Sequence, residues 1–322
     1  MVSEPGYSPM WTLCLGYAIL QAALGPNRLG ALQKCKKYIS RRDGHLRSCP
    51  SSLVAGRPRG SSRAIETRWR GQEAVVIDDC KLWFAGFSVA RNGVGIIIGP
   101  PYKDYVVGVD RCSDRIMSVR LVIQEVTYMV ISAYAPHVGL GEEEKRRFWV
   151  SLDEVLRSCP ADHRLLVGGD FSVHIGTVSK GYTGVHGGFG YGVRNVEGRS
   201  ILDFVVAHDL VAANSFFRKT EAQLATFHIG GHSTQIDYLL LRKGDLRACR
   251  DCRVLTTWTC SNQHILLVMD LVLQRRATRS ARPVQPRIIW KNLNGVIAET
   301  FKVSVLERVE AGVKIATHGD PD

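Results

Sequence analysis

The sequence has 322 residues, of which 45% are hydrophobic and 22% are charged. This length suits one large α/β domain or two ordinary ones, and this composition excludes general disorder. The formal net charge is +12, but twelve Lys and Arg against two acidic residues lie between Arg28 and Arg70, whereas residues 71–273 carry 21 basic and 22 acidic residues. Attraction to phosphates would therefore come from the flanks, and a solvated basic tail is an equally good interpretation.

The nine cysteines are an odd number spread over the whole chain. They do not form a disulfide framework, so we expect a reducing compartment, nuclear or cytoplasmic. Cys249 and Cys252 form one CxxC motif without a second pair. Exposed or core thiols therefore explain this motif better than a zinc site.

The N-terminal region divides into an apolar and a basic part. The apolar run at residues 10–24 is shorter than the roughly 20 residues of a membrane span and lacks the positive residues that precede a secretory core. We expect it to be a peripheral segment without stable membrane association. Residues 25–60 are basic and rich in Gly, Pro and Ser, so we expect residues 1–63 to form an irregular basic segment.

Short β-branched runs between turn residues begin after Glu66. They predict strands of an antiparallel or mixed sheet at residues 74–77, 82–85, 93–98, 105–109, 116–123 and 127–134. Residues 142–157 predict a helix, because Phe148, Leu152 and Leu156 fall on one face and acidic residues begin it. Further along, the pattern indicates a helix at 200–208, strands at 235–241 and 265–273, and a helix at 296–309.

A glycine-rich stretch covers residues 176–192. No strand leads into it and no Lys-Ser/Thr follows, so a flexible surface loop explains it better than a phosphate cradle. The non-repeating order of strands and helices favours a layered α/β sandwich. We expect that domain at residues 64–273, followed by a basic linker and the C-terminal helix at 274–322.

The octet LLVGGDFS at residues 165–172 predicts a buried strand that ends on two glycines and presents Asp170. A carboxylate at that position can bind a divalent metal or orient a water molecule, and the glycines allow a substrate to approach closely. A strand that ends in a Gly-Asp turn is also common in proteins without an active site. The octet supports an active site only together with the other candidate catalytic groups in the chain.

Four further groups lie at the ends of predicted strands: Glu66, Tyr134, Asp237 and His264. Carboxylates with one imidazole and one phenol suit metal-assisted phosphodiester hydrolysis, in which one acid aligns the attacking water and a carboxylate-paired imidazole assists at the phosphate. Each group alone also has a structural explanation. Tyr134 fits a core aromatic residue, Asp237 a turn cap and His264 a surface or structural histidine.

The order of these groups resembles the endonuclease/exonuclease/phosphatase superfamily, and in particular the endonuclease domain of LINE retrotransposons. The resemblance is closer still to craniofacial development protein 2-like sequences, many of them retroelement-derived. It spans residues 66–273 and continues weakly through 287–310. The motifs that carry it are ETRW, KLWFAG, ARNGVGIII, ISAYAPHVGLGEEEKRRFW, LLVGGDFSVHIG, GRSILDFVVAHDLVAANSFF, TQIDYLLLRKGD and QHILLVMDLVL.

The resemblance implies a DNase-like α/β sandwich and a role for each group. Glu66 corresponds to the metal-binding glutamate, Tyr134 to the active-site tyrosine, Asp170 to the aspartate that orients the nucleophile, and Asp237 with His264 to the acid–imidazole pair. The implied cofactor is Mg²⁺ or Mn²⁺, which oxygen ligands favour. The implied partner is DNA, contacted through the basic flanks.

The sequence departs from that pattern at three places. Ser172 stands where the family has an Asn that contacts the phosphate or the water, and serine reaches less far. Gln263 replaces an Asp ligand before the histidine. Residues 28–63 contain no apolar run that ends in Asn, so we expect the first strand to be missing or replaced.

Three functions stay open from the sequence. The first is a metal-dependent endonuclease, a phosphodiesterase acting on DNA. The second is a catalytically dead relic that binds nucleic acid through its basic flanks, and the third is a phosphatase of the same superfamily. The near-neutral region at 71–273 lacks a basic pocket motif, which disfavours the phosphatase.

Overall fold

The computed structural model describes residues 10–16, 19–24, 72, 74–77, 80–86, 92–99, 102–259, 263–273, 295–296, 298–300 and 302–307. The chain divides into two units, Met1–Arg275 and Arg276–Asp322. The second unit contains a helix within residues 296–307, as the sequence predicts, and its described side chains are largely exposed. All the strands in the described part of the chain belong to the first unit.

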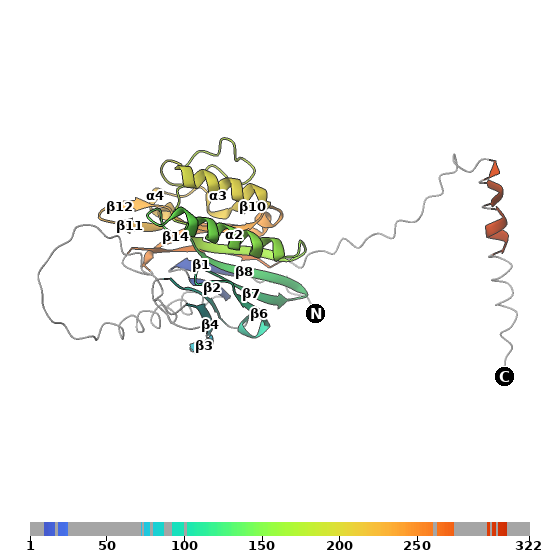
Figure 1. Cartoon of the computed structure of the whole chain (residues 1–322), viewed down its shortest axis with the longest axis horizontal. Helices are drawn as coiled ribbons and strands as arrows, with labels where there is room; N and C mark the ends of the chain where they lie inside the picture. The colour runs from blue at the N-terminus through green and yellow to red at the C-terminus, as the bar shows by residue number, and fades with distance from the viewer. Residues whose placement is uncertain are drawn as a thin grey trace, which may run out of the picture. The chain divides into compact units, whose positions relative to one another are not determined.

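Two mixed sheets form the centre of the first unit (Figure 1). The seven-stranded sheet has the order β14 (Cys249–Thr259), β15 (Ile265–Val272), β1 (Met10–Gly16), β2 (Ile19–Leu24), β5 (Val94–Ile98), β4 (Cys80–Ala85) and β3 (Ala74–Ile77). The six-stranded sheet has the order β10 (Leu210–Ala212), β13 (Asp237–Arg242), β9 (Arg164–Asp170), β8 (Val126–Tyr134), β7 (Ile116–Ile123) and β6 (Val106–Arg111). A small hairpin joins β11 (Phe227–Ile229) to β12 (His232–Thr234).

The helices cover the outer face of the six-stranded sheet (Figure 1). Helix α2 (Glu142–Ser158) follows β8, and helix α3 (Val196–Ala207) follows the loop after β9. Short helical segments complete the unit: η1 (Tyr102–Tyr105), η2 (Ala213–Ser215), α4 (Glu221–Leu224) and η3 (Lys243–Ala248). The layers are therefore helices, a sheet and a second sheet, which confirms the expected layered α/β sandwich.

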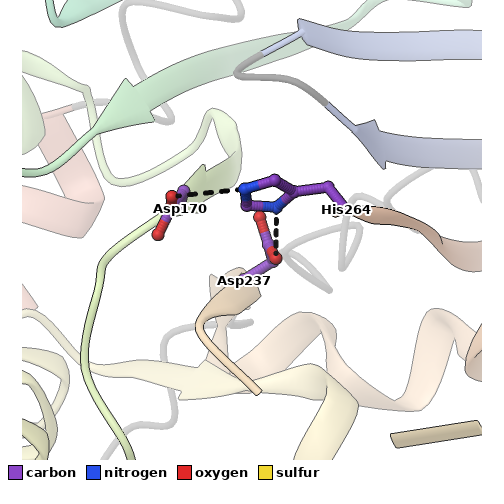
Figure 2. Close-up of side chains that lie close together, drawn as sticks. All are labelled: Asp170, Asp237 and His264. Carbon is purple, nitrogen blue, oxygen red and sulfur yellow. Dashed lines mark hydrogen bonds and ion pairs between the residues drawn. The ribbon is translucent and has the colours of Figure 1, made fainter. Parts of the chain in front are cut away.

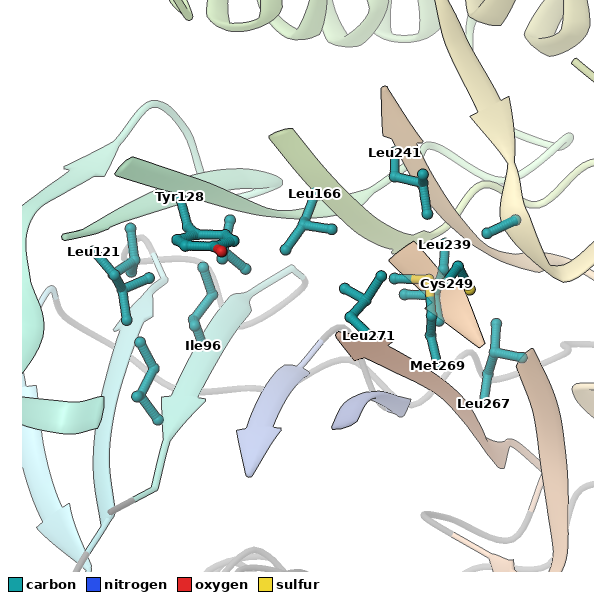
Figure 3. Packing of buried hydrophobic residues seen from close by; sticks show 14 of the residues in the cluster. Ile96, Leu121, Tyr128, Leu166, Leu239, Leu241, Cys249, Leu267, Met269 and Leu271 are labelled. Carbon is teal, nitrogen blue, oxygen red and sulfur yellow. The ribbon is translucent and has the colours of Figure 1, made fainter. Parts of the chain in front are cut away.

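Two hydrophobic cores follow from the alternation of side chains along the strands. In β8, Tyr128 and Val130 face the core between the sheets, whereas Met129 and Ile131 face the core beneath the helices. Leu239 and Leu241 of β13 meet Leu267, Met269 and Leu271 of β15 in the core between the sheets (Figure 3). Both faces of β8, β9, β10 and β13 are buried, which is why these strands are apolar at most positions, whereas the edge strand β6 is partly exposed.

The N-terminal apolar run departs from our expectation. It is not a peripheral segment within an irregular region at 1–63, but two strands that occupy central positions of the seven-stranded sheet. β1 pairs antiparallel with β15, and β2 pairs parallel with β5. We expected the first strand of the family pattern, which ends in Asn, to be missing or replaced. The first described strand, β1, contains no Asn, which fits a replacement.

Other differences concern boundaries and one strand. Helix α3 begins at Val196, earlier than predicted, because the Asn195 side chain accepts the Gly198 N–H and caps it. The CxxC motif lies in β14, a strand that the sequence did not predict. Both thiols are buried, so of the two interpretations, exposed or core thiols, the second is confirmed. Burial raises the pKa of Cys249 to about 12. Among the described helices, none has the length and apolar character needed to cross a bilayer.

Within the glycine-rich loop at 176–192, His186 is 1% exposed and bonds to two other residues of the loop. Its Nδ1 accepts a hydrogen bond from the Gly188 N–H at 2.9 Å, and its Nε2 lies 3.0 Å from the Gly176 carbonyl. Burial lowers the pKa of His186, which keeps the ring neutral and able to make both bonds. The histidine therefore fixes the loop internally, and the Phe189 N–H, which donates to the Ser215 carbonyl at 3.0 Å, ties to the body of the unit the loop that we expected to be flexible.

Gly169 lets β8 and β9 approach closely just before the end of β9. A Cβ atom at Gly169 would lie 2.2 Å from the Ala133 carbonyl oxygen, which real structures do not show. We predict that Gly169→Ala lowers the free energy of unfolding by about 2–4 kcal/mol because the strands must separate. Urea unfolding measures the change. Gly141→Ala, at a glycine with nothing within 4 Å of such an atom, is the matched control, and an equal effect of both changes would contradict the argument.

Candidate active site at the junction of the two sheets

Three strands bring their ends to one edge of the six-stranded sheet. Tyr134 is the last residue of β8 and pairs with Asp170, the last residue of β9, in the parallel register. Asp237 is the first residue of β13 and pairs with Asp170 from the antiparallel side. Residues more than 30 positions apart in sequence therefore meet because the sheet register aligns them. The sequence had placed all three at strand ends.

His264 reaches the same place from the other sheet. It immediately precedes β15, and its ring stacks edge-on against Phe227 with centroids 4.8 Å apart. Its Nδ1 is hydrogen-bonded to Asp237 Oδ2 at 3.2 Å, and its Nε2 lies 3.9 Å from Asp170 Oδ2 (Figure 2). The imidazole thus lies between two carboxylates. We call Asp170, Asp237 and His264 the acid–histidine cluster.

Burial dominates the electrostatics of the acid–histidine cluster, whose three side chains are all nearly enclosed. Desolvation and the neighbouring Asp237 charge raise the pKa of Asp170 to about 7. Burial alone would lower the pKa of His264, but Asp237 and Asp170 outweigh it and raise the pKa to about 9. At neutral pH the histidine is therefore protonated, while Asp170 exchanges its proton near the pH of the cell.

Hydrogen bonds fix the Asp170 carboxylate and the backbone of Asp237. The Ser172 N–H donates to Asp170 Oδ1 at 2.8 Å, and the Ser172 hydroxyl donates to the same oxygen at 3.3 Å. The backbone N–H of Asp237 donates to Thr226 Oγ1, and the carbonyl of Asp237 accepts from Asn214 Nδ2, each at 3.2 Å. Asn214 is 2% exposed and also accepts from the Leu239 N–H. These contacts hold β13 in register with the site.

Tyr238 is a supporting residue that the sequence did not single out. Its hydroxyl lies 3.0 Å from the Val173 carbonyl and 2.9 Å from the Gln235 carbonyl, and it accepts from the Ile175 N–H. It therefore joins the segment after Asp170 to the turn before Asp237. Neither Tyr238 nor Asn214 could be found by their spacing, although both lie inside the motifs that carry the resemblance.

Tyr134 lies beside the acid–histidine cluster, but its ring is 6% exposed and belongs to the core between the sheets. Arg115 lies over that ring at 5.2 Å, donates to the Tyr134 carbonyl and forms an ion pair with Glu144 at 2.7 Å. The structure thus supports the interpretation of Tyr134 as a core aromatic, and its catalytic role stays a proposal. Glu66, the expected metal ligand, lies outside the described residues.

The carboxylates of the acid–histidine cluster suit a divalent cation, whereas its imidazole does not. One ligand atom from each of Asp170, Asp237 and His264 lies within 4.8 Å of the others. Carboxylate oxygens are the donors that Mg²⁺ and Mn²⁺ prefer, and a cation would offset the two buried negative charges. The imidazole already pairs with Asp237 and suits Mg²⁺ poorly, so the oxygens of the carboxylates are the fitting ligands.

The chain is 27% identical over 252 residues to craniofacial development protein 2 of Bos taurus, which covers 77% of this chain and 42% of that protein. The same protein of Tragulus javanicus is 28% identical over 222 residues, with 68% and 38% covered. This chain is similar to craniofacial development protein 2. It spans about two fifths of the length of these relatives, and the resemblance to them that the motifs indicated is confirmed. No family model matches the chain.

Solved structures with a similar fold include nucleases of the endonuclease/exonuclease/phosphatase type. The endonuclease domain of TRAS1, a telomere-specific non-LTR retrotransposon, is 14% identical with a TM-score of 0.45, covering 61% of this chain and 82% of that one. The AP endonuclease LMAP from Leishmania major is 12% identical with a TM-score of 0.47, covering 62% and 72%. The catalytic domain of Xenopus laevis APE2 is 13% identical with a TM-score of 0.46, covering 62% and 79%.

Proposed function

We propose that this chain is a divalent-metal-dependent phosphodiesterase that cleaves DNA and derives from a retroelement endonuclease. The observation that supports it is the meeting of Asp170, Asp237 and His264, three groups from separate segments, in one buried cluster. Buried ionisable groups cost stability unless they are paired, and pKa values displaced this far are typical of functional sites. An aspartate that only caps a turn, or a histidine with only a structural role, would require neither this buried pairing nor such displaced pKa values.

Each member of the cluster has a role in hydrolysis. Asp170, with a pKa of about 7, accepts the proton of the attacking water at neutral pH. His264 is held protonated by Asp237 and donates a hydrogen bond to a phosphate oxygen as negative charge grows there. When bound by Glu66 and an oxygen of Asp237, Mg²⁺ or Mn²⁺ would stabilise charge on the phosphate and the leaving oxygen. One P–O bond forms to the water oxygen and one breaks.

The proposal is tested by incubating the full chain with supercoiled plasmid and with a duplex that contains an abasic site, each with Mg²⁺, Mn²⁺ or EDTA. We expect nicking that requires the cation and is lost in Asp170→Ala. Cutting that survives Asp170→Ala at the wild-type rate would show that the cluster is not the active site.

A second candidate, a catalytically dead nucleic-acid-binding relic, is favoured by Ser172. Its binding would depend on the basic residues between Arg28 and Arg63. Deleting the whole N-terminal region cannot test this, because β1 and β2 belong to the central sheet. Replacing the Lys and Arg of 28–63 by Gln leaves the strands intact. A relic would then bind DNA more weakly with a smaller salt slope and would never cut it.

Ser172→Asn separates the two candidates further. Ser172 has a φ of 52°, a left-handed conformation that Asn adopts more readily than Ser. Asn also keeps the backbone N–H bond to Asp170 and places an amide farther towards a substrate. We predict that Ser172→Asn raises the cleavage rate about tenfold, or creates activity where the wild type has too little to detect. Ser172→Ala is the control, and a rate that falls in Ser172→Asn would contradict the prediction.

A further inference from the structure

A cavity of about 340 Å³ opens beside the acid–histidine cluster. Its inner wall includes Ala135, which follows Tyr134, and Phe171 and Ser172, which follow Asp170. The Ala135 N–H donates to the Asp170 carbonyl at 2.8 Å, so the backbone that positions the carboxylate is also part of this wall. The N-terminal turns of α2 and α3 form the outer wall. This volume falls in the range of small-molecule sites.

The apolar part of the cavity wall combines the aromatic residues Trp149 and Phe171 with five aliphatic ones, Ala135, Pro136, Val138, Val173 and Val196. Trp149 stacks on Phe171 at 18° with centroids 6.1 Å apart, and Phe204 supports it at 5.1 Å. Trp149 is half-buried, whereas Phe171 is 1% exposed. The indole is thus held rigidly by its neighbours. Phe148 also packs edge-on against the indole at 5.2 Å, and the part of Trp149 that lines the cavity offers apolar aromatic surface to a nucleobase.

The charges at the cavity exclude a second phosphate as its occupant. Lys145 and Arg146 line it, but so do Glu142 and Glu197. Both basic groups are already paired, Lys145 with Glu142 and Arg146 with Glu143, each at 2.7 Å. The acidic residues also offset the positive ends of the two helices. An anion would therefore gain little binding free energy in this cavity. An uncharged ligand with polar edges would instead find both hydrogen-bond donors and hydrogen-bond acceptors among the lining side chains.

We propose that this cavity binds the nucleobase of a nucleotide next to the scissile phosphate. This inference rests on the proposed function, since it places the phosphate at the acid–histidine cluster and the base in the adjacent cavity. A strand turned out of the duplex, or a single strand, would present its base to Trp149, and the polar residues of the rim would contact the base edge. The cavity would then decide which sites are cut.

Free nucleosides test the cavity without any cleavage. Calorimetric titration of the full chain with thymidine, deoxyadenosine and deoxyribose should show binding of the nucleosides and none of the sugar. Ser200→Trp introduces a large side chain at a lining residue on an exposed face of α3, and should weaken nucleoside binding at least tenfold. Val206→Trp, at a residue of the same helix that is 53% exposed and absent from the lining, should leave it unchanged.

The outcomes separate the two proposals. Nucleoside binding that Ser200→Trp weakens supports the cavity even if no DNA is cut. Failure of the folded wild type to bind any nucleoside, or equal binding by Ser200→Trp, overturns it even if DNA is cut at the cluster. With an active enzyme, an abasic residue beside the scissile phosphate should raise KM in the wild type and have a smaller effect in Ser200→Trp. Equal KM values for base and abasic substrates would also overturn it.

Discussion

Replacing Asp170 by Asn should make the metal-free protein more stable and remove its activity. The folded structure raises the pKa of Asp170 to about 7, from an ordinary value near 4, so ionisation costs stability. This cost is absent below about pH 4, grows as the pH rises, and is complete above about pH 7. Asn keeps the bond from the Ser172 N–H without the charge. We expect the free energy of unfolding at pH 8 to rise by about 1–3 kcal/mol.

Urea unfolding in EDTA at pH 5 and pH 8 measures this effect, and the gain should be much smaller at pH 5. The cleavage rate should fall by about 10²–10⁴-fold, the usual contribution of a general base. Asp153→Asn is the control, because the Arg157 hydrogen bond lowers the pKa of that half-buried carboxyl, so removing its charge does not stabilise the fold. A stability of Asp170→Asn below that of the wild type at pH 8 would contradict the electrostatic account.

Replacing His264 by Gln should have the opposite effect on stability. The imidazolium is the positive group between two buried carboxylates, and removing it leaves their charges uncompensated. We expect a loss of about 2–4 kcal/mol at pH 7 and loss of cleavage. The folded pKa of about 9 lies above the ordinary 6.5, so the contribution of His264 is complete below about pH 6.5 and disappears as the pH rises through 9.

The difference in unfolding free energy between His264→Gln and the wild type should therefore shrink from pH 7 to pH 9.5. Urea unfolding in EDTA at the two values measures it. His232→Gln is the matched control, since His232 is exposed on the β11–β12 hairpin outside the cluster. A difference that grows with pH would mean that the folded structure does not hold His264 protonated.

The sequence was informative where local pattern and structure coincide. The runs at 74–77 and 116–123 are strands with the predicted bounds, and the helix predicted at 142–157 ends one residue later. These segments are dictated by side-chain alternation or by one apolar helical face. Asp170 could be placed because the two glycines before it mark the end of a strand.

The remaining structure depends on partners that no local pattern reveals. β1 and β2 are strands because β15 and β5 pair with them, and their sequence alone resembles an apolar surface segment. β14 contains charged residues and a CxxC motif, and it pairs with β15 through a register shift. Tyr238 and Asn214 support the site through hydrogen bonds to backbone that folding brings near. Such contacts have no signature in residue spacing.

The central claim is that Asp170 and His264, from separate sheets, act as one coupled site. A double-mutant cycle of Asp170→Asn and His264→Gln, followed by urea unfolding in EDTA at pH 7.5, tests it without requiring activity. We predict a coupling free energy of about 1–3 kcal/mol, because removing the Asp170 carboxylate removes one of the two negative charges that the imidazolium offsets. Effects that add to within about 0.5 kcal/mol would show two independent residues and contradict the claim.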